Sequence, residues 1–537
     1  MLLSSAYCLT LTSEDLKNDS FTTLIKKISE EVDSQGRNFL DWDSSVTFYQ
    51  QLAIDYPYIV RELKTLGTTE LGENIYGLHM SYQYTSEIDD LGISDRSEFL
   101  TDIAKPSIVI IGGHLGNSMV AHSFIMALIS KLVHGFHNDN TKLINLLKMR
   151  HIWFVPYLNI DTYKYIQSYT GSISNVQNML KSRKVQDTCN DLEIGVNLLN
   201  NYGDNWGIDN FGSSNVQCLS RYRGTAAFSA AETTVIQNFF NSVNDPKVIL
   251  SLESSGNYIK YPFNYQNDAS NPLLSSKYYS WFYTSLIRDV SEYNTGIRMG
   301  NYVSLFRLTN NGDNDDYFRN TKNIMSFTWN VGHSDYGTLA LSDTTAEKIS
   351  NIISTNLDLG IYAIEKAGEQ ITATVRHFNV CIPTTEECDG YEPSYGVWRY
   401  FVRIQVYNTG VMDLLTLSEV KFILSNSLMS FDESSYTSAT STSRRSLSSA
   451  VSIVKTSFYS QEQDVINYEA IIEHDTSDDP LKSANSLGDL SVTLTYYGST
   501  ITIKDLAFSS YDAYKDTLDE YYYSRMKRGT FVIFVLF

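Results

Sequence analysis

The fold is decided by one short stretch, Ser107-Ile108-Val109-Ile110-Ile111-Gly112-Gly113-His114-Leu115-Gly116-Asn117. Its first five residues form an apolar, mostly β-branched run that paired glycines terminate, which predicts a fully buried strand. A helical pattern follows from Met119 to Val133, so strand, glycine turn and helix make the first half of a βαβ unit. Ligands of α/β sheets bind where strand ends meet loops. His114, in the glycine turn, is therefore the first candidate for a functional residue.

Strands and helices alternate on both sides of this stretch out to about residue 368. This alternation predicts an α/β fold in which helices cover both faces of a mixed sheet of about eight strands. We expect strands at 59–66, 74–84, 151–157, 247–252 and 324–329, and helices at 12–35, 43–52, 233–242, 275–290 and 344–366. Asp43 or Ser44 is the expected N-cap of the second helix, and Ser229 with Glu232 resembles a capping box before the third.

The pattern changes after residue 372, where six segments alternate apolar and polar residues with a period of two. Such alternation with turn residues between segments predicts an antiparallel β-sandwich. The expected organisation is an N-terminal extension at 1–38, an α/β domain at 39–368 and a sandwich domain at 372–537. The last seven residues, Phe531 to Phe537, are apolar. A membrane span needs about 20 residues, so we predict a final strand and no transmembrane span, with a clipped anchor as the alternative.

Composition excludes some functions and leaves others open. The chain has 537 residues, 42% of them hydrophobic, and a net charge of −20. Nucleic-acid binding requires clustered Lys and Arg, so we predict no nucleic-acid partner.

Five cysteines are present, without a CxxC pair that would favour a cysteine zinc site. We predict two local disulfides, Cys189–Cys218 and Cys381–Cys388, although four cysteines allow three pairings. Such bridges suit an oxidising compartment, whereas free buried thiols are the alternative. The first residues resemble either a truncated signal peptide or an ordinary first strand. A secreted or cell-surface protein is expected, with an intracellular compartment as the alternative.

Several short motifs follow one another in a fixed order: Tyr56-Pro57, Leu66–Gly72, Asn159–Tyr163, Gly195–Tyr202, Tyr222-Arg223-Gly224 and Tyr261-Pro262. The order and spacing resemble the zinc carboxypeptidases, the carboxypeptidase A-like metallopeptidases. Asn159–Tyr163 resembles the family's Asn-Pro-Asp-Gly-Tyr, and Gly195–Tyr202 its Gly-Val-Asp-Leu-Asn-Arg-Asn-Tyr. The resemblance covers about residues 40–367 and implies a sheet of the phosphorylase/hydrolase type.

The resemblance also implies a zinc site, which the family builds from His-x-x-Glu after one strand and a His after a later strand. In the register that needs no gap, these three positions fall on Leu115, Ser118 and Glu253. An alternative register places the first two on His114 and Asn117. Neither register retains the glutamate ligand.

The family's catalytic glutamate falls on Asn330, whose amide cannot take a proton from water. The Asn-Arg pair that holds a substrate carboxylate falls on Leu199 and Asn200, and leucine cannot make a charge-assisted bond. Lys181, near the place of the oxyanion arginine, keeps its charge. Because metal, base and clamp positions all depart from the family pattern, we predict a catalytically inactive pseudoenzyme with no cofactor and with a binding or assembly role.

Two other functions remain open. The first is an active zinc carboxypeptidase with a rearranged metal site, built from His114, Glu253 and one further ligand; the candidates are His79, His122, Asp204 and His333. The second is carbohydrate binding through the sandwich, because Arg403–Gly410 and Leu417–Val420 faintly resemble cellulose-binding sandwiches. Protein partners or further copies of the chain are the expected partners of an inactive protein.

Overall fold

The computed structural model describes residues 9–33, 35–83, 105–184, 189–254, 256–266, 290, 296–332 and 344–368, and beyond these the strands of the C-terminal part. The chain divides into two compact units, one formed by residues 1–94 and 100–368, the other by 95–99 and 369–537. Each unit has its own sheets.

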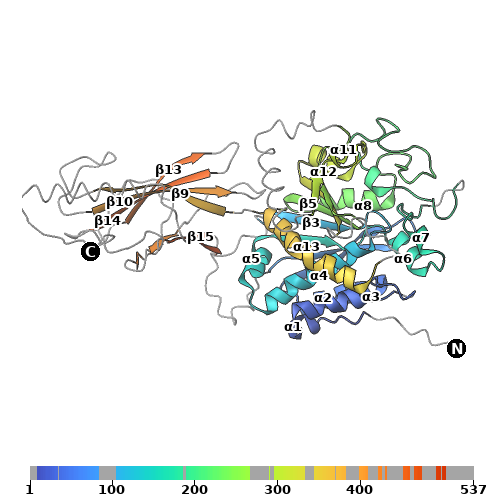
Figure 1. The fold of residues 1–537 in the computed structure, drawn as a ribbon, viewed down its shortest axis with the longest axis horizontal. Coiled ribbons are helices and arrows are strands. Elements are labelled where there is room, and N and C mark those ends of the chain that lie inside the picture. The colour runs from blue at the N-terminus through green and yellow to red at the C-terminus, as the bar shows by residue number, and fades with distance from the viewer. Residues whose placement is uncertain are drawn as a thin grey trace, which may run out of the picture. The chain divides into compact units, whose positions relative to one another are not determined.

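An eight-stranded mixed sheet forms the centre of the first unit (Figure 1), in the order β1-β2-β4-β3-β5-β8-β6-β7. Its strands are β1 Val60–Thr68, β2 Asn74–Met80, β3 Ser107–Gly112, β4 His151–Val155, β5 Pro246–Ser254, β6 Tyr258–Lys260, β7 Arg298–Gly300 and β8 Met325–Val331. The four central strands, β4, β3, β5 and β8, run parallel, whereas β1, β2 and β6 add antiparallel pairings. The predicted mixed α/β sheet is therefore confirmed.

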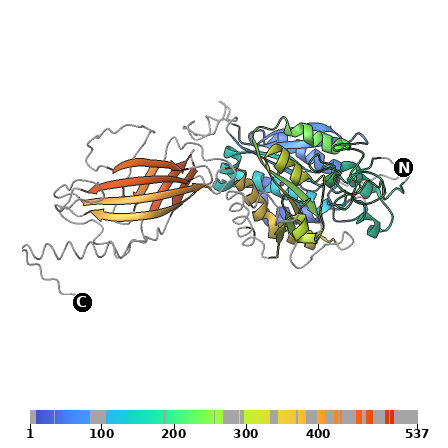
Figure 2. The same ribbon diagram turned by 90° about the horizontal axis from the view of Figure 1, so that it is seen from above.

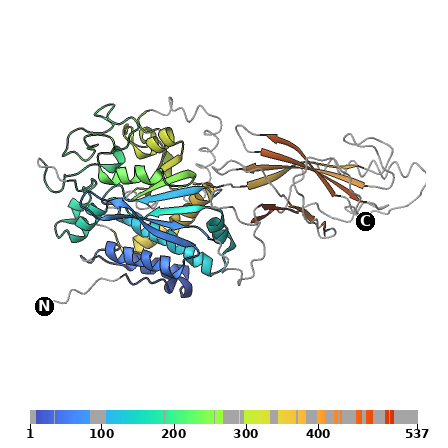
Figure 3. The ribbon, with the colours of Figure 1, turned by 180° about the vertical axis from the view of Figure 1, so that it is seen from behind.

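Helices cover both faces of this sheet (Figure 3). They are α1 Asp15–Asn18, α2 Phe21–Glu30, α3 Trp42–Asp55, α4 Met119–His137, α5 Thr141–Met149, α6 Ile160–Ser168, α7 Ile173–Val176, α8 Ala231–Phe240, α11 Tyr302–Phe306, α12 Asn314–Lys322 and α13 Ala346–Lys366. On one face of the sheet, α4 contacts β3, β5 and β8 and also packs against α2 and α13. Separately, α12 packs on β8. Every residue of β3, β4 and β8 is buried, as expected for parallel strands covered on both sides.

The turn from β3 into α4 depends on glycine. Gly113 has φ +60°, and a Cβ atom there would lie 2.3 Å from the ring of Tyr157. Among the described residues, α4 is long and apolar enough to cross a bilayer, but 83% of its apolar window is buried inside the unit. That burial is typical of a core helix.

Two predicted helix starts are wrong. The N-cap of α3 is Asp41, whose carboxylate accepts the Ser44 N–H at 2.8 Å, not Asp43 or Ser44. Before α8, Ser229 and Glu232 form no capping box, and the N-cap is Ala230. A distant side chain replaces the cap, because the Asn201 amide oxygen accepts the Ala230 N–H at 3.0 Å. At α3 the cap is a local carboxylate two residues before Asp43, whereas at α8 a tertiary contact satisfies an N–H group at the helix start.

The second unit contains two four-stranded antiparallel sheets (Figure 2), in the orders β13-β14-β10-β9 and β12-β11-β15-β16. The strands are β9 Ile371–Cys381, β10 Trp398–Asn408, β11 Lys421–Ser425, β12 Ser430–Phe431, β13 Val451–Tyr459, β14 Val465–His474, β15 Ser491–Tyr496 and β16 Ser499–Ile503. The predicted change from alternating strands and helices to antiparallel strands is present.

Candidate functional site

The candidate site lies at the carboxyl ends of the parallel strands. His114 follows β3, Glu253 is near the end of β5, and Asn330 is near the end of β8. Glu253 and Asn330 are partners in the β5–β8 register. The topology thus brings to one edge of the sheet side chains that are more than two hundred residues apart in the sequence, as expected for an α/β sheet.

Glu253 is the centre of the site and is fully buried. Its Oε1 accepts the His114 N–H at 2.9 Å, and its Oε2 accepts the Leu115 N–H at 3.1 Å. The Ser118 hydroxyl also donates to Oε2, at 2.6 Å. Both carboxylate oxygens are therefore bonded to the loop that joins β3 to α4, through charge-assisted hydrogen bonds.

The His114 side chain is enclosed by protein and has no exposed surface. Its Nε2 lies 2.9 Å from the Tyr202 hydroxyl, and its Nδ1 lies 3.3 Å from Glu253 Oε1. Burial raises the pKa of Tyr202 well above its ordinary value, so that hydroxyl stays neutral. The His114 carbonyl accepts the Asn159 amide at 3.1 Å. Tyr202 and Glu253 therefore contact the imidazole, and Asn159 holds the main chain of the same residue.

The side chains at the positions predicted for the metal ligands are a poor donor set for zinc. Leu115 has no ligand atom, and the Ser118 hydroxyl, which donates to Glu253, also accepts the Ser254 N–H at 3.1 Å. In the alternative register, Asn117 points its amide at the Gln177 carbonyl, 2.9 Å away. Zinc in catalytic sites takes three protein ligands drawn from His, Cys, Asp and Glu. Within the described part of the chain, no three such side chains are grouped to hold a metal.

The candidates for a further ligand are held elsewhere. His122 lies between the hydroxyls of Tyr49 and Tyr163, each at 3.1 Å, and burial lowers its pKa to about 3. His79 is 2.9 Å from His151, and Asp204 accepts amide N–H groups from Asn205 and Asn320. His333 lies outside the described residues.

Of the two positions predicted for the substrate clamp, Asn200 is engaged by internal hydrogen bonds. Asn200 is buried and donates to Asn310 Oδ1 at 2.7 Å and to the Asn311 carbonyl at 3.0 Å. Leu199 ends in an apolar side chain. Lys181 donates to the Gln217 carbonyl at 2.7 Å, and burial lowers its pKa to about 8.

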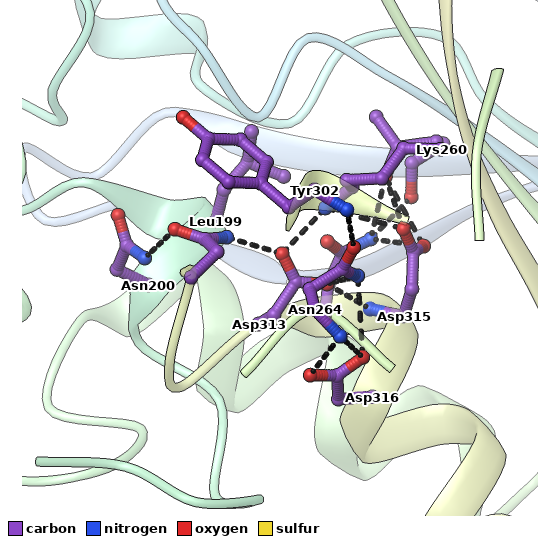
Figure 4. A network of polar contacts seen from close by, with 12 residues as sticks. Leu199, Asn200, Lys260, Asn264, Tyr302, Asp313, Asp315 and Asp316 are labelled. Atoms are coloured by element: carbon purple, nitrogen blue, oxygen red, sulfur yellow. Dashed lines mark hydrogen bonds and ion pairs between the residues drawn. The ribbon is translucent and has the colours of Figure 1, made fainter. Parts of the chain in front are cut away.

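The sequence analysis missed a buried ionic network beside Asn200 (Figure 4). Lys260 is paired with Asp313 and lies 3.2 Å from Asp315, while Asp316 accepts the Asn264 N–H at 2.9 Å through both oxygens. Burial raises the pKa of Asp315 to about 7 and that of Asp316 well above its ordinary value. Asn310 joins Asn200 to Asp313. The acidic run at 313–316 was visible in the sequence, but no local signal showed that Lys260 would be buried against it.

The structure contains the predicted disulfide between Cys189 and Cys218. The second predicted pair, Cys381–Cys388, cannot be placed, because Cys388 lies outside the described residues.

A sequence model of the zinc carboxypeptidase family matches residues 46–356, more than half of the chain. The chain belongs to the zinc carboxypeptidase family. The family predicted from the order of motifs is thus confirmed.

The chain is similar to two curated members of this family. It is 24% identical to mast cell carboxypeptidase A of Rattus norvegicus over 267 residues, covering 47% of this chain and 57% of that protein. It is also 24% identical to zinc carboxypeptidase A 1 of Drosophila melanogaster over 266 residues, covering 47% of this chain and 54% of that protein. The chain spans a little more than half the length of these relatives.

Two solved structures are also similar. Thrombin activatable fibrinolysis inhibitor has a TM-score of 0.48 and 17% sequence identity, and the match covers 66% of this chain and 81% of that chain. Carboxypeptidase A from Helicoverpa armigera has a TM-score of 0.45 and 20% sequence identity, and the match covers 61% of this chain and 74% of that chain. The family assignment rests on the family match.

Proposed function

We propose that this zinc carboxypeptidase family member is a catalytically inactive pseudoenzyme that acts by binding other proteins or further copies of itself. The observation that carries the proposal is the buried Glu253 carboxylate, whose two oxygens are bonded to the loop that carries the other ligand positions. To bind a metal, Ser118 and Glu253 would first have to give up these hydrogen bonds.

Two further features support the proposal. Asn330 stands at the position of the catalytic base, and an amide has no basic lone pair near neutral pH. Asn200 and Leu199 stand at the substrate clamp without a positive charge, and Asn200 is engaged by Asn310. A reaction that needs a metal, a base and a clamp would have to recruit all three from other residues.

The remaining predictions belong to the same proposal. The Cys189–Cys218 bridge supports a secreted or cell-surface location. The two antiparallel sheets of the second unit support a β-sandwich that serves as a binding module, with carbohydrate as one class of ligand. The net charge of −20 supports partners other than nucleic acids.

Metal content and peptidase activity of the purified full chain test the proposal. We expect no stoichiometric zinc by elemental mass spectrometry, no release of C-terminal amino acids from peptides, and no change of the unfolding temperature with a chelator. One zinc per chain, lost on chelation together with peptidase activity, would instead establish the alternative, an active carboxypeptidase with a rearranged metal site.

A Glu253→Ala variant refines that test. If zinc is bound through Glu253, the variant loses both metal and activity. If zinc is found and remains in this variant, the metal is held away from the carboxyl ends of β3 and β5, and the rearranged site is elsewhere.

A further inference from the structure

Five exposed apolar side chains gather on the loops beside the clamp positions. Phe211 is 88% exposed, and the other four are 53–55% exposed. The five, which we call the rim patch, are Ile208, Phe211, Val216, Leu219 and Leu308. Exposed apolar side chains scattered singly are ordinary, whereas a group of them on one surface indicates an interaction site.

Hydrogen bonds join the segments that carry the rim patch. The Arg221 guanidinium donates to the carbonyls of Gly212 and Thr309, each the next residue after a patch side chain. It also donates to Asn310 Oδ1 at 2.6 Å. Ser214 and Arg221 pair through their main chains at 2.8 Å. The segments at 208–216, 219–221 and 308–311 therefore form one surface.

The same loops are held rigidly. Asp209 Oδ1 accepts the N–H groups of Phe211 at 2.8 Å and Gly212 at 2.7 Å, and the Asn311 amide at 2.8 Å. The Cys189–Cys218 bridge fixes the loop between Val216 and Leu219. A loop that is already ordered loses little conformational entropy when a partner binds, so its exposed phenylalanine can contribute fully to affinity.

Two arginines, Arg221 and Arg307, accompany the rim patch, although the chain carries a net charge of −20. All oxygens bonded to Arg221 are uncharged carbonyl or amide oxygens, and its guanidinium lies 5.4 Å from the Tyr302 ring centre. Arg307, next to Leu308, is exposed. No ion pair involving either arginine is present among the described residues. Asp209 is the acidic residue of the segments 208–216, 219–221 and 308–311, and its Oδ1 accepts three N–H groups. Asn310, which accepts from Arg221, donates in turn to Asp313 of the buried network.

We propose that the rim patch binds a polypeptide segment in which apolar side chains alternate with carboxylates. The apolar side chains would pack on Phe211 and Leu308, and the carboxylates would pair with Arg221 and Arg307. This inference rests on the proposed binding function and names the class of partner. It does not depend on whether zinc is bound at the buried Glu253.

Synthetic peptides serve as the probe, measured with the full chain by fluorescence anisotropy. The test peptide has about 12 residues with Asp and Glu between Phe and Leu; one control replaces the acids by Lys and another replaces Phe and Leu by Ala. We expect the test peptide to bind at least about tenfold more tightly than either control. Phe211→Ser and Arg307→Glu should each weaken its binding by about tenfold or more.

Ile54→Ser is the matched control, because Ile54 is 69% exposed on α3 and lies outside the rim patch. All three variants should unfold at the wild-type temperature, since each replaces an exposed side chain. Ile54→Ser should bind the test peptide as the wild type does.

Other outcomes overturn the proposal. Equal binding of acidic and basic peptides, or no binding of either, rules out an acidic apolar partner. If sedimentation shows a dimer and Phe211→Ser abolishes it, the patch binds a second copy of the chain. If the protein adsorbs to phosphatidylcholine vesicles and Phe211→Ser abolishes the adsorption, the patch binds a lipid surface. Because zinc content and peptidase activity are measured separately, failure here leaves the proposed loss of catalysis intact.

Discussion

At the scale of single residues, Glu253 joins two elements through hydrogen bonds. Its carboxylate, on β5, accepts two main-chain N–H groups and one hydroxyl from the loop between β3 and α4. These donors are buried, so removing their acceptor would leave them without partners, which costs more free energy than a single exposed hydrogen bond contributes. The carboxylate therefore stabilises the loop in its present conformation.

The first prediction follows from this geometry. Glu253→Gln keeps the size of the side chain but removes the negative charge and turns an N–H₂ group toward donors. We expect the free energy of unfolding to fall by about 2–4 kcal/mol. Urea denaturation of the two proteins at neutral pH measures the difference.

Ser118→Ala is the comparison for this prediction, because it leaves the charge and removes one neutral hydroxyl, which donates to Glu253 and accepts the Ser254 N–H. It should cost about 1 kcal/mol. Equal stability of Glu253→Gln and the wild type would show that the carboxylate does not hold the loop.

The sequence predicted where these residues stand but not what they contact. Leu115, Ser118 and Glu253 were located by the order of motifs, which needs no knowledge of side-chain direction. The bonds of Glu253 go largely to main-chain N–H groups, which have no sequence signature. The Tyr202 hydroxyl that meets His114 is 88 residues away in the chain, so only the folded topology could identify it.

At the scale of elements, α6 and α8 hold the turn between β1 and β2. Asp161 of α6 accepts the Thr69 hydroxyl at 2.6 Å and the Leu71 N–H at 2.9 Å. Glu232 of α8 is fully buried, and its Oε1 lies 3.5 Å from the Glu70 N–H. Oε2 of Glu232 has no hydrogen-bond partner within the described structure. Burial, together with the negative charges of Asp161 and Glu70, raises the pKa of Glu232 to about 7.

The second prediction concerns the pH dependence of stability. Because the pKa of Glu232 rises from 4.5 in the unfolded chain to about 7 in the folded protein, the folded state binds the proton more tightly. Its contribution is therefore fully present below about pH 4.5 and is lost as the pH rises through about 7. Glu232→Gln, which cannot ionise, should gain stability relative to the wild type over this range, by up to about 3 kcal/mol.

Denaturation of both proteins at several values between about pH 5 and 8 isolates this contribution, since all other groups titrate alike in the two. The Lys184–Glu70 ion pair, at 3.3 Å, faces the same turn and is unchanged by the substitution. A stability difference that stays constant across the range would show that Glu232 keeps an ordinary pKa.

Secondary structure was predicted well where periodicity is strong and poorly where tertiary contacts decide. The buried strands β3 and β5 and the amphipathic α13 have clear patterns, and each lies within a few residues of its predicted bounds. Helix α6 begins inside the Asn159–Tyr163 motif, and α12 begins in an acidic run capped by Asp313, so neither showed an apolar stripe. The predicted single helix at 12–35 is two helices, α1 and α2, because Ser20 starts a new N-cap.

At the scale of the whole molecule, the chain keeps the family's sheet, and internal hydrogen bonds engage Ser118 and Glu253, two of the positions predicted for metal ligands. The eight-stranded sheet places the four critical positions at one end of the parallel strands, whatever side chains occupy them. The scaffold is therefore independent of the chemistry that the family performs on it. Four substitutions would give this scaffold the family's residues again: Leu115→His, Ser118→Glu, Glu253→His and Asn330→Glu.

The last prediction is that these four substitutions act only as a unit. Any one of them alone should give neither zinc binding nor peptidase activity, because groups that act together in a site are strongly non-additive. Glu253→His alone should also destabilise the protein, since the N–H groups of His114 and Leu115 lose their acceptor. In the quadruple variant, zinc should restore this loss by about 2.7 kcal/mol at a hundredfold excess over its dissociation constant. Unfolding curves of the quadruple variant with zinc and with a chelator measure the effect. If the variant is equally stable under the two conditions, β3, β5 and β8 no longer hold these positions in metal-binding geometry.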